Sequence, residues 1–190
     1  MKKILFLSMI FALIHSVSFA QLENRFSIGP RLGINFSNIN SSSTKNLTGV
    51  AGGITSTYSI NEKSGITLDV LYSAEGHKNG NLEVERNYLK IPVIYNTFFG
   101  RLGEAFRPKI YLGFAPGFLL DAQVNDVETT DDHKSTTLDL VGGLGFNQRI
   151  SNRIWLNADL RALWGITPIQ ESGDFKNRTI QATLGIAYGI

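Results

Sequence analysis

The last eleven residues of the chain, Ile180 to Ile190, alternate in hydropathy with a period of two. Every even-numbered position in this segment is apolar, and every odd-numbered position between them is polar or small. This period predicts a β-strand with one apolar face and one polar or small-residue face. A barrel that spans a membrane needs such a strand with its apolar face outward, whereas a soluble barrel turns its polar face outward.

The first twenty residues have the pattern of a cleavable secretory signal. Lys2 and Lys3 form a positive start, an apolar run follows over 4–14, and Ser18 and Ala20 are small residues where a signal peptidase reads. The apolar run is too short to cross a bilayer as a helix. We therefore expect a signal peptide over 1–20 and a mature barrel domain over 21–190.

The charge of the mature chain is close to neutral. The whole sequence has 18 basic and 16 acidic residues, and cleavage removes Lys2 and Lys3 without removing an acid. This balance gives no support for nucleic-acid binding. The sequence has no cysteine, which excludes disulfide bonds and thiolate metal sites. We expect neither a cofactor nor a metal.

Seven further segments repeat the alternating pattern at the length of a tilted membrane strand. Beyond the signal, no apolar run is long enough for a membrane helix, so a membrane-embedded mature chain has to be a closed barrel. The sequence thus predicts an all-β fold, an eight-stranded antiparallel transmembrane β-barrel. Its expected strands are 25–37, 48–60, 64–75, 85–98, 108–121, 135–149, 153–165 and 180–190.

Long polar connections alternate along the chain with shorter ones. The short turns are 61–63 and 150–152, and 99–107 is longer than a tight turn. The expected long loops are 38–47, 76–84, 122–134 and 166–177. Long outer loops with short periplasmic turns are typical of bacterial outer-membrane barrels, so we expect this location, with both termini in the periplasm.

The fourth expected strand breaks the parity of the others. Even-numbered residues point outward in seven strands, whereas Leu89, Ile91 and Val93 form the apolar face of 85–98. A shift of one residue exchanges the two faces of a strand. We expect its cause to be an odd residue count in the loop 76–84 or a bulge near Pro92.

The inward-facing positions include five basic and five acidic residues. The interior of an eight-stranded barrel is only wide enough to be filled by side chains, and an unpaired buried charge is costly. We therefore expect a network of ion pairs in the lumen, formed by Arg31, Asp69, Glu75, Lys90, Lys109, Asp121, Asp139, Arg149, Asp159 and Arg161. The alternative is a narrow polar conduit whose constriction contains Lys90, Asp159 and Arg161.

Catalytic and metal-binding patterns are weak in this chain. His133 and Ser135 resemble the His-x-Ser pair of outer-membrane lipid A deacylases, but Asn147 stands where that family has a glutamate. A catalytic triad needs a nucleophile, a base and a group that orients the base. The acidic residues of 128–132 lack the spacing of a calcium loop. We expect a protein that is not an enzyme.

Four segments resemble the Bacteroidota outer-membrane β-barrel proteins, the porin family with PorT-like members. The sequence 29–37 resembles that family's first strand, and 87–93 contains its Tyr-Leu-x-Ile-Pro pattern in the fourth. The segments 111–117 and 139–145 resemble its fifth and sixth strands. The resemblance implies an outer-membrane barrel without implying a particular activity.

The end of the chain resembles the assembly signal of outer-membrane barrels. The pattern is polar-x-Gly-x-x-hydrophobic-x-hydrophobic, and Thr183, Gly185, Tyr188 and Ile190 occupy its places. The chain departs from it at Ile190, where a terminal aromatic residue is usual. The resemblance implies that the barrel-assembly machinery is a partner.

Three functions are compatible with these features. The first is a structural or binding barrel whose outer loops contact lipopolysaccharide, other outer-membrane lipid or other envelope proteins. The second is a small porin-like pore for ions or small solutes. The third, a lipid A-modifying enzyme, depends on His133.

Overall fold

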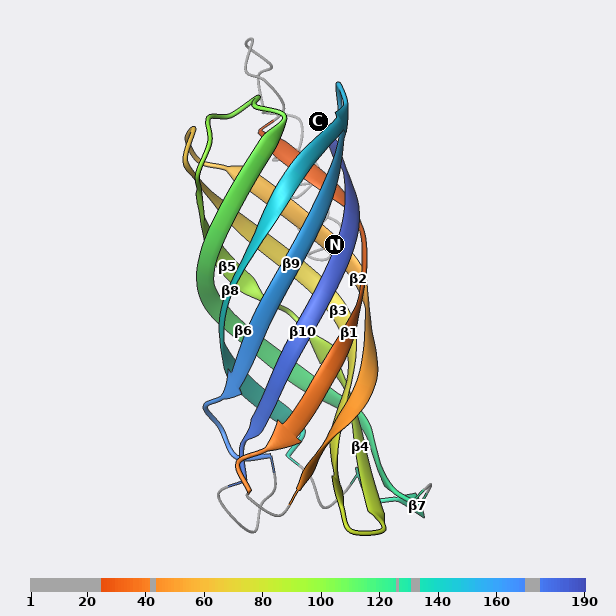
Figure 1. Cartoon of the computed structure of the whole chain (residues 1–190). Helices are drawn as coiled ribbons and strands as arrows, with labels where there is room; N and C mark the ends of the chain where they lie inside the picture. The colour runs from red at the N-terminus through yellow and green to blue at the C-terminus, as the bar shows by residue number, and fades with distance from the viewer. Residues whose placement is uncertain (1–24, 42–43, 126, 131–133, 170–174) are drawn as a thin grey trace, which may run out of the picture.

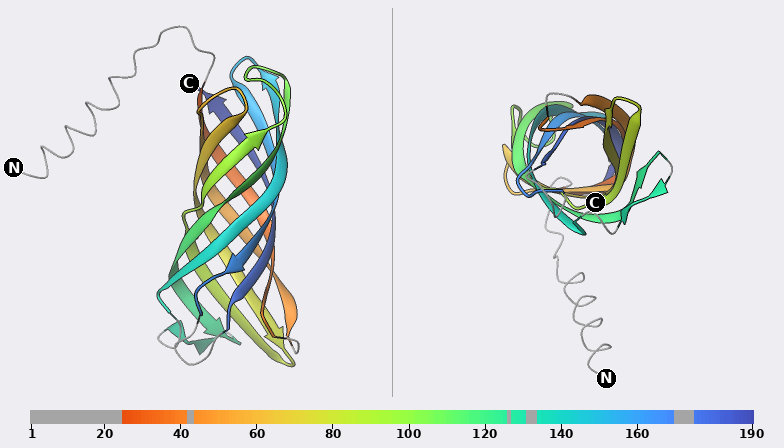
Figure 2. Two further views of the ribbon diagram at one scale, coloured as in Figure 1. Left: turned by 90° about the vertical axis from the view of Figure 1, so that its left-hand side faces the viewer. Right: turned by 90° about the horizontal axis from the view of Figure 1, so that it is seen from below.

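The computed structural model describes residues 25–41, 44–125, 127–130, 134–169 and 175–190. Within these residues the chain forms an antiparallel barrel, elongated along its axis and seen as a ring from one end (Figures 1 and 2). In the described part of the chain, no helix is long and apolar enough to cross a membrane. The expected signal peptide, 1–20, lies outside the described residues.

The wall is a single sheet that closes on itself. Its segments are β1 (Phe26–Ile39), β2 (Lys45–Ser59), β3 (Ser64–Asn79), β4 (Leu82–Lys90), β5 (Val93–Phe98), β6 (Phe106–Val124), β7 (Val127–Glu128), β8 (Thr136–Ser151), β9 (Ile154–Gly165) and β10 (Asn177–Gly189). The last strand pairs with the first, with Ile180 opposite Phe36 and Tyr188 opposite Ile28. This closure leaves no wall strand with an open edge.

Eight strands surround the lumen, although ten segments are assigned. β4 and β5 both pair with β3 on one side and β6 on the other, so they are two parts of one wall strand. The strand is interrupted at Ile91 and Pro92, because proline has no amide hydrogen for the ladder. β7 pairs with the end of β6 only and adds no strand to the ring. The predicted fold class is confirmed.

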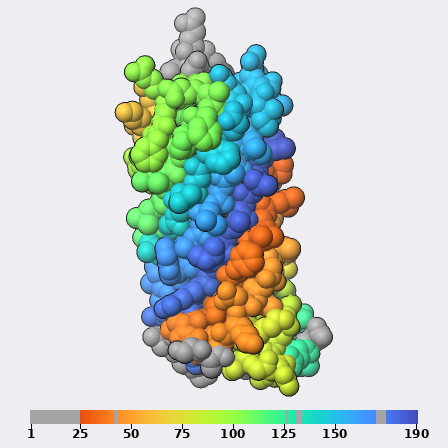
Figure 3. Space-filling view, viewed as in Figure 1, coloured from red at the N-terminus to blue at the C-terminus, as the bar shows by residue number. Residues whose placement is uncertain are grey.

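The outer face of the wall is apolar on every strand. Leu32 on β1 is 70% exposed and Leu184, opposite it on β10, is 60% exposed. These two strands lie side by side along the wall in Figure 3. The other wall strands carry matching exposed side chains, namely Ile54, Val70, Val93, Leu112, Leu144 and Leu160. Such a surface is stable in contact with lipid rather than water.

The two ends of the barrel differ in their connections. Both ends of the described chain meet at one end, where the amide of Ile190 donates to the carbonyl of Phe26 at 2.8 Å. The connections 60–63, 99–105 and 152–153 lie at this same end, which we call the turn end. The connections after β1, β3 and β9, and the short strand β7, lie at the opposite loop end (Figure 1).

The second connection at the loop end is shorter than expected. Instead of a long loop over 76–84, β3 continues to Asn79 and β4 begins at Leu82, opposite it. Gly80 takes a positive φ of 61° in the turn between them, a conformation that favours glycine. The turn therefore has two residues rather than an odd number. It shifts the parity by pairing odd-numbered inward positions of β3 with even-numbered ones of β4, and β5 keeps that parity beyond Pro92.

Candidate functional site

Five buried charged residues form a cluster across the middle of the lumen, which we call the cross-barrel cluster. Its members are Arg31, Asp69, Lys109, Asp159 and Arg161. They belong to β1, β3, β6 and β9, which are alternate strands around the ring. Inward side chains of alternate strands share a level inside a small barrel, and this places the five side chains in one layer.

The contacts of this cluster join opposite walls. Arg31 lies 3.6 Å from Asp69 and 3.0 Å from Asp159, and Lys109 lies 2.9 Å from Asp159. Arg161 donates from Nη1 to Oδ2 of Asp69 at 2.9 Å. β3 and β9 are four places apart in a ring of eight, so this last bond crosses the full width of the lumen.

An aromatic side chain covers the cluster from β6. The ring of Tyr111 lies 5.8 Å from the guanidinium carbon of Arg161 and 5.6 Å from Nζ of Lys109, within the range of cation–π attraction. Its hydroxyl donates to the carbonyl of Leu160 at 3.3 Å. Gly143 on β8 provides the space, because a β-carbon there would lie 2.6 Å from the Tyr111 hydroxyl oxygen.

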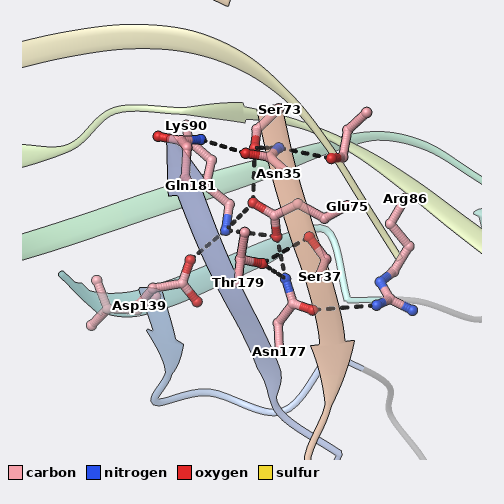
Figure 4. A network of polar contacts seen from close by, with 12 residues as sticks. Asn35, Ser37, Ser73, Glu75, Arg86, Lys90, Asp139, Asn177, Thr179 and Gln181 are labelled. Carbon is pink, nitrogen blue, oxygen red and sulfur yellow. Dashed lines mark hydrogen bonds and ion pairs between the residues drawn. The ribbon is translucent and has the colours of Figure 1, made fainter. Parts of the chain in front are cut away.

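A second group of contacts lies toward the loop end, and we call it the loop-end network (Figure 4). Nζ of Lys90 lies 2.9 Å from Oε1 of Glu75 and also contacts the carboxylate of Asp139. Glu75 accepts a hydrogen bond from Ser73 at 2.8 Å and another from the side-chain amide of Asn177. One buried ammonium group thus holds two buried carboxylates.

Neutral polar side chains extend this network across the seam of the barrel. Gln181 donates to Oδ1 of Asn35 at 2.7 Å, and Asn35 donates to Ser73 at 2.9 Å. Thr179 donates to the hydroxyl of Ser37 at 3.0 Å. These residues were not distinguishable in the sequence, because uncharged polar side chains are ordinary on an inward face. Their odd numbers on β1, β3 and β10 were the available signal.

Arg86 on β4 is a buried charge outside the predicted lumen set. It is fully buried, with Nη2 3.4 Å from Oδ1 of Asn177 and Nη1 3.4 Å from Nδ1 of His77. Among the described residues, no carboxylate forms an ion pair with it. It shares the even parity of Tyr88 and Lys90, so the shifted parity of this strand was sufficient to find it.

The structure brings eight of the ten predicted lumen residues into these two groups and leaves out Asp121 and Arg149. In β6, Leu119 pairs with Tyr88 whereas Asp121 pairs with Asn87, so Leu120 forms a bulge. Beyond the bulge Ala122 faces inward, and Asp121 lies on the other face, where it accepts from Asn87 at 3.0 Å. The bulge thus removes Asp121 from the lumen.

Arg149 lies at the turn end rather than among the buried charges. Its side chain is exposed, and its guanidinium carbon lies 5.9 Å from the ring centre of Trp155. Another arginine of this end, Arg107, is buried, stacks 4.0 Å from the ring of Phe98 and donates to the carbonyl of Glu62 at 2.9 Å.

The buried charges of the lumen are therefore not balanced as the sequence suggested. The described buried cations are Arg31, Arg86, Lys90, Arg107, Lys109 and Arg161, and the buried anions are Asp69, Glu75, Asp139 and Asp159. Positive charge exceeds negative charge by two. The difference arises because Arg86 and Arg107 enter the set while Asp121 and Arg149 leave it.

The residues of the expected assembly signal all lie on or after the closing strand β10. Thr183 is buried and accepts a hydrogen bond from Arg31 at 3.4 Å, and Gly185 lies opposite Arg31. Tyr188 and Ile190 are exposed on the outer face at the turn end. The Tyr188 hydroxyl accepts a hydrogen bond from Arg153 at 3.2 Å.

The remaining candidates bring no catalytic or metal site together in the described residues. His133 lies outside them, together with Asp131 and Asp132, and Glu128 is exposed on β7. Within the described ranges, no group of three or more histidine or acidic side chains could hold a metal ion.

Comparison with known proteins gives the same fold. The model of a family described as "Outer membrane protein beta-barrel domain" matches residues 5–187. Among solved structures, Neisserial surface protein A is 15% identical, with a TM-score of 0.60 over 87% of this chain and 97% of that one. The E. coli outer membrane protein W is 15% identical, with a TM-score of 0.56 over 90% of this chain and 100% of that one. OprG from Pseudomonas aeruginosa is 15% identical, with a TM-score of 0.55 over 87% of this chain and 95% of that one. No curated protein matches the sequence.

Proposed function

Because the chain belongs to the outer-membrane β-barrel domain family and is an outer-membrane protein, we propose that it is a non-enzymatic barrel that acts through its loop end. In this proposal the lumen is a structural plug and not a pathway. The observation that carries it is the bond between Arg161 and Asp69, which crosses the lumen inside a layer of five buried charges. The loop end contacts lipopolysaccharide or another envelope component.

The energetics of the cross-barrel cluster favour a closed lumen. Removing one partner from a buried ion pair costs about 3–5 kcal/mol, so a solute that displaced these side chains would meet a similar penalty. The loop-end network adds a second obstruction, because Arg86 and Asn177 also come from opposite strands. A conducting path would have to break contacts in both groups.

The shape of the loop end supports contact with a partner outside the membrane. β4 and β7 project past the rest of the barrel in Figure 1. Leu82 at the start of β4 is exposed, and Val127 on β7 is 65% exposed. The proposal takes this projecting tip, with its exposed apolar side chains, as the contact surface.

A narrow pore is the second candidate, and the charge of the lumen gives it a specific form. Six buried cations against four anions would favour the passage of anions over cations. Recording in planar bilayers separates the two candidates. The plugged barrel predicts no steady single-channel steps for the refolded protein and new steps for the Asp69→Ala/Arg161→Ala double variant. Steady steps from the unmodified protein would refute the plug.

Binding at the loop end has its own test. Protein in phospholipid nanodiscs should shift in native electrophoresis when purified lipopolysaccharide is added. Leu82→Ser with Val127→Ser should weaken that shift, whereas Asn81→Ser, at the exposed tip of the same hairpin, should not. The absence of a shift from the unmodified protein would exclude lipopolysaccharide as the partner.

Two finer assignments belong to the same proposal. The segments 29–37, 87–93, 111–117 and 139–145 support membership of the Bacteroidota porin-family, PorT-like branch. The basic and apolar pattern of 1–20 supports secretion by a cleaved signal. Mass spectrometry of protein from outer membranes should then give a mature N-terminus at Gln21.

A further inference from the structure

Basic side chains ring the turn end of the barrel. We call this set the basic collar, and its members are the half-buried Arg25 and the exposed Lys63, Arg101, Arg149 and Arg153. They come from the start of β1, the end of β8 and all three connections of the turn end. The described acidic residues at this end are only Glu62 and Glu104, so the five described cations of the collar exceed them by three.

The collar lies at the edge of the apolar wall. Phe26, Tyr58, Phe99 and Tyr188 are exposed outer-face side chains at the same end. Aromatic rings of membrane barrels gather at the level of the lipid headgroups. Because the guanidinium group of Arg153 donates to the hydroxyl of Tyr188 at 3.2 Å, at least this cation lies at headgroup level.

The cations of the collar are not neutralised within the described chain. Arg25 approaches only a backbone carbonyl, that of Ile60 at 3.5 Å, and Arg149 lies against the ring of Trp155. In the described residues, no carboxylate forms an ion pair with any member of the collar. Their charge is thus directed to whatever surrounds the barrel at this level.

The loop end has a different balance. Its described basic residues, Lys45, Lys78, Lys134, Lys176 and Arg178, are accompanied by the acidic residues Glu83, Glu85, Asp121 and Glu128. In the sequence, the connections after β6 and β9 also contain Asp126, Asp131, Asp132, Glu171 and Asp174. Counted over the sequence, the loop end has nine acidic residues against five basic ones, whereas the five collar residues face only Glu62, Glu104 and, in the sequence beside Arg25, Glu23.

From these observations we infer that the basic collar binds anionic phospholipid headgroups of the phosphatidylglycerol type in the periplasmic leaflet. Guanidinium groups pair well with phosphate, and basic residues beside an anionic lipid surface are attracted to it within a Debye length. The even spread of the cations around the circumference fits a ring of boundary lipids better than one acidic protein docked on a single patch.

The test compares lipid selectivity at the protein surface. Refolded protein in phosphatidylcholine vesicles is studied by electron spin resonance with trace spin-labelled phosphatidylglycerol or phosphatidylcholine. The unmodified protein should associate more strongly with the phosphatidylglycerol label. Arg25→Gln/Arg153→Gln should reduce that preference by about twofold or more. Adding about 0.5 M salt should reduce the preference of the unmodified protein as well, because salt at this level screens charges beyond about 3–10 Å.

A matched control removes the same charge from the other end. Lys45→Gln/Arg178→Gln should leave most of the preference in place, because acidic residues accompany these cations. Heat-modifiable gel migration shows that each variant is folded before its selectivity is measured. An unmodified protein without preference, a collar variant that keeps the full preference, or an equal loss in the control would each refute the proposal.

Discussion

Nη1 of Arg161 lies 2.9 Å from Oδ2 of Asp69, although β9 and β3 stand on opposite sides of the barrel. Arg31 also approaches that carboxylate, at 3.6 Å, so one buried acid serves two arginines. The carboxylate therefore ties three wall strands together through the interior, in addition to their backbone ladders. Its removal should affect the whole barrel rather than one strand.

Asp69→Asn should lower the free energy of unfolding by about 3–5 kcal/mol, because it leaves two buried guanidinium groups without their shared counter-charge. Urea titration of the refolded protein in vesicles measures the change. Lys78→Gln, which removes the exposed ion pair with Glu83, is the control and should cost about 1 kcal/mol or less. Equal effects of the two substitutions would contradict a special role for the buried acid.

Arg86→Met, unlike Asp69→Asn, should not lower the free energy of unfolding substantially. Arg86 has no acidic partner among the described residues, so an apolar side chain of similar volume removes a buried charge without breaking an ion pair. We expect the free energy of unfolding to stay within about 1 kcal/mol of the original value or to rise. Arg161→Met, which breaks the bond with Asp69, is the comparison in the same titration. If Arg86→Met lowers the free energy of unfolding as much as Arg161→Met does, the interactions of Arg86 stabilise the barrel as strongly as those of Arg161, and the expectation is wrong.

Gly143→Ala should destabilise the barrel, because the new methyl group would lie 2.5 Å from the backbone carbonyl oxygen of Leu160 and 2.6 Å from the Tyr111 hydroxyl. Overpacking of this kind costs about 1–3 kcal/mol. The adjacent Gly142→Ala is a matched control, since a methyl group there would meet Trp164 at 3.4 Å and Leu112 at 3.6 Å, close to ordinary contact distances. Adding Tyr111→Leu to Gly143→Ala should recover part of the loss. Equal effects at the two glycines would refute the packing argument.

Gly80→Ala should cost about 1–2 kcal/mol, because a residue with a β-carbon is strained at a φ of 61° even where there is open space around it. Gly80→Asn should cost less, since asparagine tolerates this conformation. Equilibrium unfolding of both variants gives the comparison. If alanine and asparagine are equivalent, the hairpin between β3 and β4 does not depend on this backbone conformation.

Tyr188→Ala should slow assembly of the barrel if the last strand is the signal read by the assembly machinery. The matched control is Ile186→Ala, which removes another exposed apolar side chain of β10 outside the pattern. The rate at which the heat-modifiable form accumulates with reconstituted machinery is the measurement. Equal rates for the two variants would argue against recognition through Tyr188.

The period of two was sufficient to predict the eight wall strands and most inward positions, because a strand with one face in lipid cannot change parity freely. It did not predict where strands end at the loop end. There β3 and β4 continue beyond the apolar wall as a hairpin, and the dipeptide Gly80-Asn81 was the local signal for its turn.

The pairing of charges inside the barrel could not be predicted from the strands taken one at a time. Which inward residues share a level depends on the stagger of all eight strands, so Asp69 could be placed inside but not opposite Arg161. The position of a bulge is equally difficult to predict from the sequence. Leu120 has no feature that marks it as the extra residue, yet it turns Asp121 out of the lumen.

The pairing of the first and last strands has a consequence for the order of events during folding. Arg31 on β1 needs Asp159 from β9, and its strand needs β10 to complete the wall. Contacts between residues so distant in sequence form late and slowly. Until the last part of the chain arrives, an intermediate has an unpaired edge and an incompletely neutralised arginine. We therefore expect the pairing of β1 with β10 and the neutralisation of the buried charges to occur together, in one late cooperative step.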